Sequence, residues 1–361
     1  VHKNSFSLCA YDGYTGEIVS ESTFASDVKL VIKFIETLKS RYENDVEIKC
    51  GYEAGCLGYS LYKSLTARGV DCVILAPTTM QVSAKNKMVK NDRMDALNIA
   101  KNLASGSYKS VYVPDEEDVE IKEYIRMIHD FKKELKRVKQ EICAFVLRHG
   151  YQYDGKSKWT IRYMNWIREL EMSEIQRETL NEYIAEMENL NDKINRFMNR
   201  IDEMYQSERY HEKVSKLRCF KGIETFAAMT IQVETADFER FPSAKAYASY
   251  TGLTTGEHSS GDKNNRIGIT KQGNTVIRKT LVECAQSLVK GNVYAKKSQG
   301  LKSRQKGMDV NIIAYADKAT ERLKKKYQKL IERNVPRNKA IVAVARELAC
   351  FIWGMETGNI H

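Results

Sequence analysis

The spacing of apolar residues changes twice along the chain and divides it into three regions. Between residues 1 and 112, Phe6, Leu8 and Ala10 alternate with polar residues up to the turn Asp12-Gly13, and a second extended run follows through Phe24, which predicts a hairpin. Helical stretches such as 27–42 stand beside it. Alternation with a period of two predicts strands, and apolar residues three and four apart predict helices. Strands that alternate with helices favour a sheet layer, so residues 1–112 are predicted to form an α/β domain.

In the second region, residues 113–212, the apolar residues recur at heptad-like spacing. One series runs from Ile121 to Phe145 and another from Leu180 to Met204, with the same alternation of three- and four-residue steps. Long helices with this pattern and much exposed charge predict an antiparallel coiled-coil hairpin or a dimerisation arm.

The segment between these two helices mixes aromatic and basic residues. Trp159, Tyr163 and Trp166 are suited to stacking on unpaired bases, while Lys158 and Arg162 are suited to holding phosphates. The same aromatic side chains would also serve to close the apolar core of the helical hairpin, and both interpretations stay open.

The third region, residues 213–361, is predicted to be all-α. Apolar faces predict helices over 243–253, 274–291, 310–333 and 338–356. The Lys221–Thr225 segment joins two further apolar runs. It reads either as a helix-hairpin-helix turn that approaches a DNA phosphate or as a tight turn between two packed helices.

A polar, glycine-punctuated stretch interrupts this helical region between Tyr250 and Arg278. It contains no apolar run from Thr254 to Arg266, which predicts a long exposed loop rather than a strand or helix. Ser259 and Ser260 lie at its centre among cations, an arrangement suited to attack on a phosphodiester. A solvated Ser/Gly/Asn loop is the alternative.

Three carboxylates in the first region are placed where metal ligands are common. Glu53 follows a predicted strand, and Asp92 and Asp95 begin a predicted helix three residues apart. Three acids at one sheet edge repel each other unless a divalent cation, usually Mg2+, lies among them. The alternative makes Asp92 a helix cap and Asp95 a first-turn acid.

The charge balance points to a polyanionic partner. The net charge is +11 and the pI about 9.1, and 20 Tyr and 11 Phe are available for stacking, so nucleic acid is favoured over membrane. The eight cysteines are scattered singly, which argues against zinc and disulfide frameworks and predicts reduced thiols in a cytoplasmic protein. No apolar run of transmembrane length is present.

Four short motifs together resemble a known family. Val1-His2-Lys3 looks like the end of a G-[IV]-D-V-x-K strand, Glu53 lies in an x-E-A-x-G turn, and Asp92 and Asp95 form an N-D-x-x-D-A helix start. The stretch from Tyr250 to Arg278 is similar to Y-x-G-L-T…S-G…G-I-T-K-x-G-N-x-x-[IL]-R. The chain thus resembles the DEDD transposases of bridge-RNA-guided insertion sequences, family one-ten, to which pilin-gene invertases are also similar.

The resemblance implies a RuvC-like catalytic domain with the RNase H fold, in which four acids bind Mg2+. Glu53, Asp92 and Asp95 match the second, third and fourth acids, and the first is expected immediately before Val1. By the same match Ser260, rather than Ser259, is the nucleophile. In the family the arm mediates assembly and helps to bind the guide RNA.

The function expected from the resemblance is RNA-guided transposition. Ser260 would attack DNA to give a 5′-phosphoserine intermediate, with a bridge RNA, donor DNA and target DNA as partners. The enzyme would act as a dimer or tetramer near the prokaryotic nucleoid. Two alternatives stay open: a RuvC-like nuclease in which water attacks, and a non-catalytic scaffold for RNA and DNA. The candidate nucleic-acid-binding residues are Lys263, Arg266, Lys271, Arg278, Lys297 and Arg304.

Overall fold

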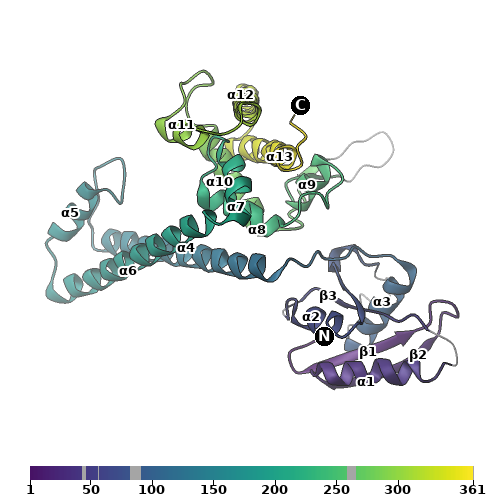
Figure 1. The fold of residues 1–361 in the computed structure, drawn as a ribbon. Helices are drawn as coiled ribbons and strands as arrows, with labels where there is room; N and C mark the ends of the chain where they lie inside the picture. The colour runs from purple at the N-terminus through teal and green to yellow at the C-terminus, as the bar shows by residue number, and fades with distance from the viewer. Residues whose placement is uncertain (43–45, 56, 82–90, 258–265, 361) are drawn as a thin grey trace. The chain divides into compact units, whose positions relative to one another are not determined.

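A computed structural model describes the chain in five segments, and its contacts separate it into two compact units, Val1–Pro114 and Asp115–His361. The described residues are 1–42, 46–55, 57–81, 91–257 and 266–360 (Figure 1). Most of the described residues are helical, and the strands are few and short. The three-domain division at residues 112 and 212 stays a prediction.

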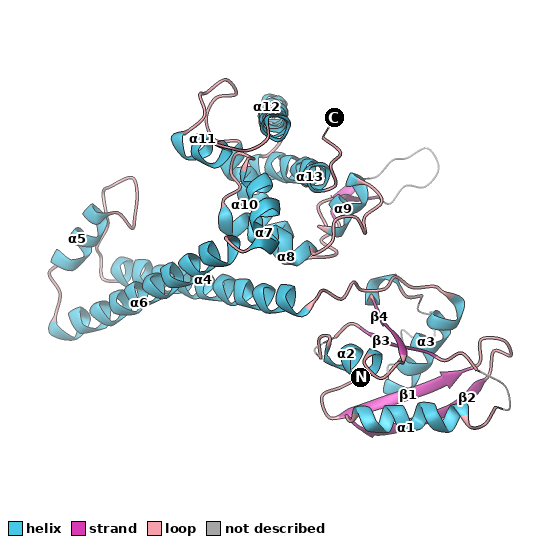
Figure 2. Cartoon of the chain, in the orientation of Figure 1, coloured by secondary structure: helices cyan, strands magenta, loops and turns pink. Residues whose placement is uncertain are grey.

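Unit 1 contains two pairs of strands (Figure 2). Strands β1 (Ser5–Tyr11) and β2 (Ile18–Ala25) form the predicted antiparallel hairpin. Strands β3 (Lys49–Glu53) and β4 (Asp71–Leu75) are parallel, with Glu53 opposite Leu75. A parallel pair needs a crossover connection, and here α2 lies between the two strands in sequence.

Three helices and one short 3-10 turn complete this unit. Helix α1 packs Val31 and Ile35 into a core with Phe6, Leu65 and Ile74, so the predicted amphipathic stretch does bury its apolar face. The elements are α1 (Val28–Lys39), α2 (Ser60–Thr66), η1 (Pro77–Thr79) and α3 (Asp92–Ser105).

Unit 2 begins with two long helices, α4 (Glu116–Arg148) and α6 (Glu174–Tyr205), which pack against each other. They are antiparallel, because Phe145 lies beside Tyr183 while Phe131 lies beside Phe197. The short helix α5 (Ile161–Glu169) lies between them in sequence. The structure therefore pairs the two heptad-patterned stretches, whereas a supercoil and a role in assembly stay predictions.

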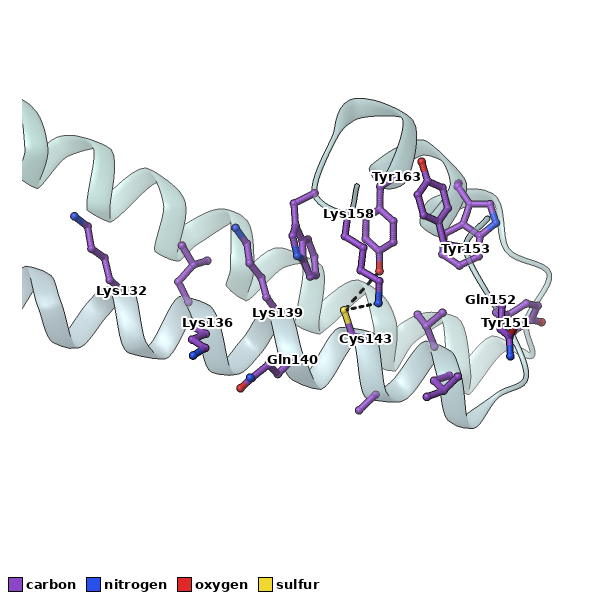
Figure 3. A pocket seen from close by; sticks show the side chains of 16 residues that line it. Lys132, Lys136, Lys139, Gln140, Cys143, Tyr151, Gln152, Tyr153, Lys158 and Tyr163 are labelled. Atoms are coloured by element: carbon purple, nitrogen blue, oxygen red, sulfur yellow. Dashed lines mark hydrogen bonds between the residues drawn. The ribbon is translucent and has the colours of Figure 1, made fainter. Parts of the chain in front are cut away.

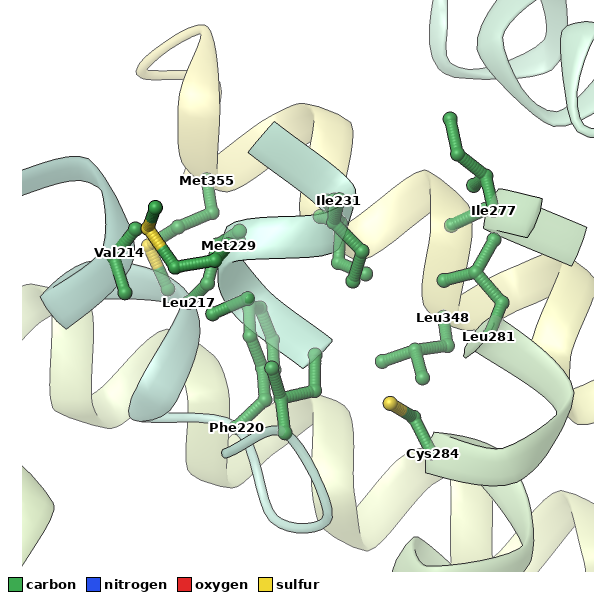
Figure 4. Close-up of a cluster of buried hydrophobic side chains, with 14 of the residues drawn as sticks. Val214, Leu217, Phe220, Met229, Ile231, Ile277, Leu281, Cys284, Leu348 and Met355 are labelled. Atoms are coloured by element: carbon green, nitrogen blue, oxygen red, sulfur yellow. The ribbon is translucent and has the colours of Figure 1, made fainter. Parts of the chain in front are cut away.

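In the rest of unit 2, helix α13 (Arg337–Glu356) contacts α7, α9, α10 and α12. Ala345 and Ala349 on α13 are fully buried, and their small side chains let neighbouring helices approach closely. Figure 4 shows part of this core. The surrounding helices are α7 (Glu208–Arg218), α8 (Thr225–Thr235), α9 (Ala244–Tyr250), α10 (Thr275–Leu288), α11 (Gln299–Gln305) and α12 (Val310–Glu332).

One expectation for this unit is wrong. The region is not all-α, because β5 (Thr255–Glu257) and β6 (Arg266–Ile269) form an antiparallel pair at the ends of the expected loop. Backbone hydrogen bonding, not an apolar pattern, defines so short a ribbon. Helix α11, in the lysine- and arginine-rich stretch 290–306, is capped by the Ser298 side chain.

Two chemical expectations can be compared with the described residues. The seven cysteines among them are all free thiols. No helix in the described part of the chain combines the length and the apolar character needed to cross a membrane.

Candidate functional site

The described ends of the serine segment form a hydrogen-bonded stem, here defined as residues 250–257 and 266–274. The amide of Thr270 donates to the carbonyl of Thr254 at 2.9 Å, and the amide of Lys271 donates to Gly252 at 3.2 Å. The amide of Asn274 donates to the carbonyl of Tyr250, also at 3.2 Å. Ser259, Ser260 and Lys263 lie outside the described residues.

Two glycines make this close approach of the stem strands sterically feasible. Gly252 has φ +68°, and a Cβ there would lie 2.0 Å from the carbonyl oxygen of Gln272. Gly273 has φ +81°, and its Cβ would lie 2.0 Å from the carbonyl oxygen of Tyr250. Any other residue would combine a left-handed backbone with a clash against main chain. This requirement explains both glycines of the sequence motif.

Asn274 fixes the far end of the stem to the rest of unit 2. Its side-chain oxygen accepts from the amides of Val276 and Ile277 and so caps α10. Its side-chain amide donates to the Glu234 carboxylate at 2.7 Å. Glu234 was not among the residues predicted from sequence, although a single acid in the apolar run of α8 was a usable signal.

Three predicted phosphate-binding residues lie in or beside the stem. Arg278 donates to the carbonyl oxygens of Thr251 and Gln272, both at 3.3 Å, so its guanidinium helps to close the stem. Lys271 is exposed and has φ +56°, an uncommon conformation for a residue with a side chain. Arg266 begins β6.

The two remaining candidates, Lys297 and Arg304, have protein partners. Lys297 pairs with Asp317 at 2.5 Å and also donates to Gln305. Arg304 is half-buried and donates to the carbonyl of Arg218 at 3.1 Å, and burial lowers its pKa. Binding of DNA by these two side chains stays a prediction.

The predicted acids of unit 1 lie at element ends. Glu53 is the last residue of β3 and is exposed, while Asp92 and Asp95 occupy the first turn of α3. The helix cap is Asn91, whose side chain accepts from the amide of Met94. Asp92 Oδ1 lies 3.0 Å from the Nε2 atom of His2. Asp92 is therefore a first-turn acid and not the cap.

The donor chemistry of these acids suits Mg2+, which prefers carboxylate oxygens together with waters. Asp92 stays more than half exposed, so its carboxylate is accessible to a hydrated ion. Within the described segments, however, no group of three or more acidic, histidine or cysteine side chains is close enough to hold a metal ion. The set fits magnesium by donor type, and the structure gives no coordination geometry.

A cavity of about 780 Å3 lies near the end of the helical pair formed by α4 and α6 (Figure 3). Lys136, Lys139 and Lys158 line it beside Trp159, and the Lys139 ammonium lies 5.3 Å from the Trp159 ring centre. The Lys158 ammonium donates to the Cys143 thiol at 3.5 Å. No carboxylate is among its lining residues, so the cavity is both basic and aromatic.

The aromatic residues of this segment divide between the two predicted roles. Tyr163 is almost fully buried and packs against Trp159, Trp166 and Tyr153, which supports a packing role for Tyr163. Trp159 is only partly buried and has φ +65°. Its ring is the one beside the Lys139 ammonium.

The Lys221–Thr225 turn packs against α10. Gly222 has φ +88°, and a Cβ there would lie 2.7 Å from the Cys284 carbonyl oxygen. The Lys221 ammonium donates to the Lys290 carbonyl at 2.5 Å, and burial lowers the Lys221 pKa to about 8. Helix packing therefore accounts for the glycine, and a DNA contact stays a prediction.

Two family models match separate parts of the chain. One, described as the transposase IS116/IS110/IS902 family, matches residues 214–299, which include the whole stem. The other, a DEDD model for IS110 that is also described as a transposase, matches residues 1–150. The matches therefore include both the predicted acids and the serine segment.

Individual relatives extend the similarity over nearly the whole chain. The y4qE protein of Sinorhizobium fredii, classed as a transposase by inference, is 31% identical over 98% of this chain and 85% of its own length. The transposase for insertion sequence element IS1533 of Leptospira borgpetersenii is 30% identical over 91% of this chain and 94% of its own. The transposase for element IS1111A of Coxiella burnetii is 22% identical over 88% and 85%.

Proposed function

Because the chain belongs to the IS116/IS110/IS902 family of transposases, we propose that it moves its own DNA element by serine transesterification under the guidance of a structured RNA. As a transposase it cuts and rejoins DNA. The DEDD match implies a RuvC-like fold for the first unit. The serine chemistry, the guide RNA and the use of Mg2+ are the proposed parts.

Ser260 is the proposed nucleophile. Its hydroxyl oxygen forms a bond to a DNA phosphorus, the bond between that phosphorus and O3′ breaks, and the 3′ oxygen leaves as a hydroxyl. The serine proton passes to a base, and the phosphate remains on the enzyme as a 5′-phosphoserine. A 3′-hydroxyl of the exchange partner then reverses the step, so bond energy is conserved without a nucleotide cofactor.

The stem is the observation that carries this proposal. A family motif of glycines, Lys271 and Asn274 brackets the serine segment. In the described residues, the two glycines leave room for carbonyl oxygens that lie only 2.0 Å from where a Cβ would stand. Arg278 donates hydrogen bonds to two stem carbonyls. An ordinary surface loop does not need such support. A loop that delivers a reacting atom does, because small displacements cost large factors in rate.

Glu53, Asp92 and Asp95 are the proposed ligands for Mg2+. A bound ion would offset the negative charge that develops on the phosphate oxygens and would favour ionisation of an attacking hydroxyl. Independently of the ion, the stem positions its own charged side chains. Arg278 keeps the stem closed, and the exposed Lys271 is available to a phosphate beside it.

The cavity beside α4 supports a single-stranded nucleic acid as a partner of the arm. Its lysines offer phosphate contacts, and the partly buried Trp159 ring offers a stacking surface. The guide RNA is the proposed ligand. The paired helices α4 and α6 are the proposed assembly element, through which Ser260 of one protomer would meet the acids of another.

Trapping of the covalent intermediate tests the central step. The full chain is incubated with Mg2+, its guide RNA and a DNA target nicked near the exchange site, and protein–DNA adducts are separated under denaturing conditions. Ser260→Ala should abolish the adduct, and Ser259→Ala should retain it. Undiminished cleavage by Ser260→Ala would support the hydrolytic alternative, with water as the nucleophile.

Sequencing of co-purified nucleic acid tests the RNA. The chain is expressed together with its flanking element, and bound RNA is extracted and sequenced. One structured RNA from the element ends is expected, and its loss in a Lys136→Glu/Lys158→Glu variant would place it at the arm cavity. Recovery of only bulk cellular RNA would contradict the guide.

A further inference from the structure

Glu234 is the most completely buried carboxylate with several cationic partners in the described part of unit 2. Its side chain is 0% exposed although it lies on α8, whose other residues are all uncharged. Burial alone would raise the pKa of Glu234, but the Arg126 hydrogen bonds, the Lys122 charge and the Asn274 amide outweigh burial and lower it. The carboxylate is therefore charged at neutral pH.

The partners of Glu234 come from the long helix of the arm and from the stem. Arg126 on α4 donates from Nε to Oε1 at 2.7 Å and from Nη2 to Oε2 at 3.0 Å, a bidentate pair. Lys122, one turn earlier on α4, lies 3.5 Å from Oε2. Asn274 donates to the same oxygen at 2.7 Å.

The main chain of Glu234 makes a second connection to the stem. Its carbonyl oxygen accepts from the Tyr250 hydroxyl at 3.1 Å, and the Tyr250 carbonyl in turn accepts from the amide of Asn274. Glu234, Tyr250 and Asn274 thus form a closed ring of hydrogen bonds across the base of the stem. One residue of α8 holds both strands of the stem.

The protein maintains this arrangement against a substantial cost. Removing a carboxylate from water is expensive, and packed apolar residues are often at least as stable as a buried ion pair. A core that needed only stability would have no use for Glu234 in α8. In the stem the group that depends on the carboxylate is Asn274, whose side-chain amide donates to Oε2, whereas Tyr250 uses the main-chain carbonyl of the same residue.

We infer that Glu234 is a positioning residue for the serine loop, which sets the stem through Asn274 and Tyr250 and links it to Arg126 of the arm helix. This inference rests on the proposed function, because it assigns the stem the task of delivering Ser260. Glu234 touches neither DNA nor the reacting atoms. It acts through the residues that it holds.

Asn274→Asp breaks the link while sparing the helix. Aspartate caps a helix as well as asparagine does, so α10 keeps its N-terminal cap. The donor toward Glu234 becomes a carboxylate, which the Glu234 charge repels. We expect the adduct-forming rate at saturating DNA to fall at least tenfold, with DNA affinity within twofold of wild type.

The double variant Glu234→Gln/Asn274→Asp restores the link with donor and acceptor exchanged. The net charge of the cluster is unchanged, and the glutamine amide can donate to the new carboxylate. We expect it to recover most of the rate lost by Asn274→Asp. Such coupling between two substitutions identifies a direct interaction, whereas two independent losses would add.

Glu347→Gln is the matched control. Glu347 is a partly buried carboxylate that, like Glu234, is held by one arginine and one lysine, here Arg322 and Lys326 at 2.5 Å, but it joins α12 to α13. We expect it to lower thermal stability without changing the adduct rate. If it slows the adduct as much as Asn274→Asp does, the effect is general destabilisation and the inference is overturned.

Amide hydrogen exchange separates this inference from the proposed function. In Asn274→Asp the backbone amides of Lys271 and of residue 274 should exchange at least tenfold faster than in the wild type, because both amides close the stem. Unchanged exchange overturns the positioning role, whatever the chemistry. If Ser260→Ala still forms the adduct while stem exchange responds as expected, the proposed nucleophile fails and the positioning role stands.

Discussion

The two halves of the proposed active site are supported in opposite ways. The stem of unit 2 is held by two left-handed glycines, a helix cap and a buried carboxylate with three side-chain partners. The acids of unit 1 stand at the ends of β3 and α3, where Asp92 contacts His2 and is half exposed. The chain itself organises the stem of the serine half, whereas the proposed cation would give the acid half its final arrangement.

The largest expected difference between the two halves is the stability lost when a glycine beside each one is replaced by alanine. Gly273→Ala adds a left-handed alanine, which costs about 1–2 kcal/mol, and a Cβ 2.0 Å from a backbone oxygen. We expect unit 2 to lose about 3 kcal/mol or more. The three tryptophans, Trp159, Trp166 and Trp353, all lie in unit 2, so urea unfolding followed by tryptophan fluorescence measures this loss.

Gly55→Ala is the control in unit 1. Gly55 follows Glu53 at a distance of two residues, has no positive φ, and its nearest neighbouring atom lies 3.8 Å from a Cβ position. Hydrogen exchange of β3 and β4 should show a change within about 0.5 kcal/mol. A loss as large as that of Gly273→Ala would remove the contrast between the two halves.

A buried histidine gives unit 2 a pH dependence. His129 on α4 is 7% exposed, and neither ring nitrogen has a hydrogen-bond partner in the described structure. Burial, followed by the charges of Lys279 and Lys132, lowers its pKa to about 4, against a smaller opposing effect of Glu234. Between pH 6.5 and 4 the unfolded chain therefore binds the extra proton, and folding stability falls as pH falls.

His129→Leu should remove this pH dependence of folding stability. Relative to the wild type, the variant should gain about 2 kcal/mol between pH 7.5 and pH 5 in tryptophan-monitored unfolding. Glu356, whose pKa burial raises to about 7, changes stability in the opposite sense over this range, but it does so in both proteins and cancels in the difference. A difference that is independent of pH would show that His129 is charged or solvated when folded.

Mg2+ should stabilise unit 1 alone. For a site with a dissociation constant near 1 mM, 10 mM Mg2+ adds about 1.4 kcal/mol. Slower hydrogen exchange in β3 and α3 is expected in the wild type but not in Asp92→Asn. Glu36→Gln, which removes an exposed acid on α1, should keep the response. Equal protection in both variants would place the ion elsewhere.

The smallest effect is expected for the exposed ion pair of unit 1. Arg93 on α3 pairs with Glu21 on β2 at 2.5 Å, and the Arg93 side chain is 74% exposed. Solvent screens such pairs, so Arg93→Ala should leave the hydrogen exchange of α3 almost unchanged. Markedly faster exchange throughout α3 would show that unit 1 also depends on a specific polar contact.

The sequence predicted helices best where an apolar face repeats over many turns. The series from Ile121 and from Leu180 became α4 and α6, because each buries one continuous stripe against the other. The β1–β2 hairpin was also predicted from its alternation. The strands β5 and β6 were missed, since three or four residues carry no usable period and their pairing depends on glycines several residues away.

The candidate site was predicted residue by residue but not as an arrangement. Sequence motifs identified Gly273, Asn274 and Arg278, yet they did not indicate that Arg278 donates to two stem carbonyls. The expected phosphate contact of Arg278 stays a prediction. Glu234 was not predicted as a site residue, because its partners Arg126 and Asn274 are 108 and 40 positions away along the chain. No local pattern encodes a contact of that kind.

The length of helix α4 determines the direction in which the arm cavity faces relative to Arg126 around the helix axis. It is a single helix of 33 residues, about 50 Å long, that carries Arg126 about one third of the way along and the cavity residue Lys139 about two thirds of the way along. Each residue added between them turns the far end by about 100°, while seven residues make nearly two whole turns. Homologous arms whose lengths differ by seven residues would therefore keep the cavity facing nearly the same way. Arms whose lengths differ by one or two residues would rotate the cavity away.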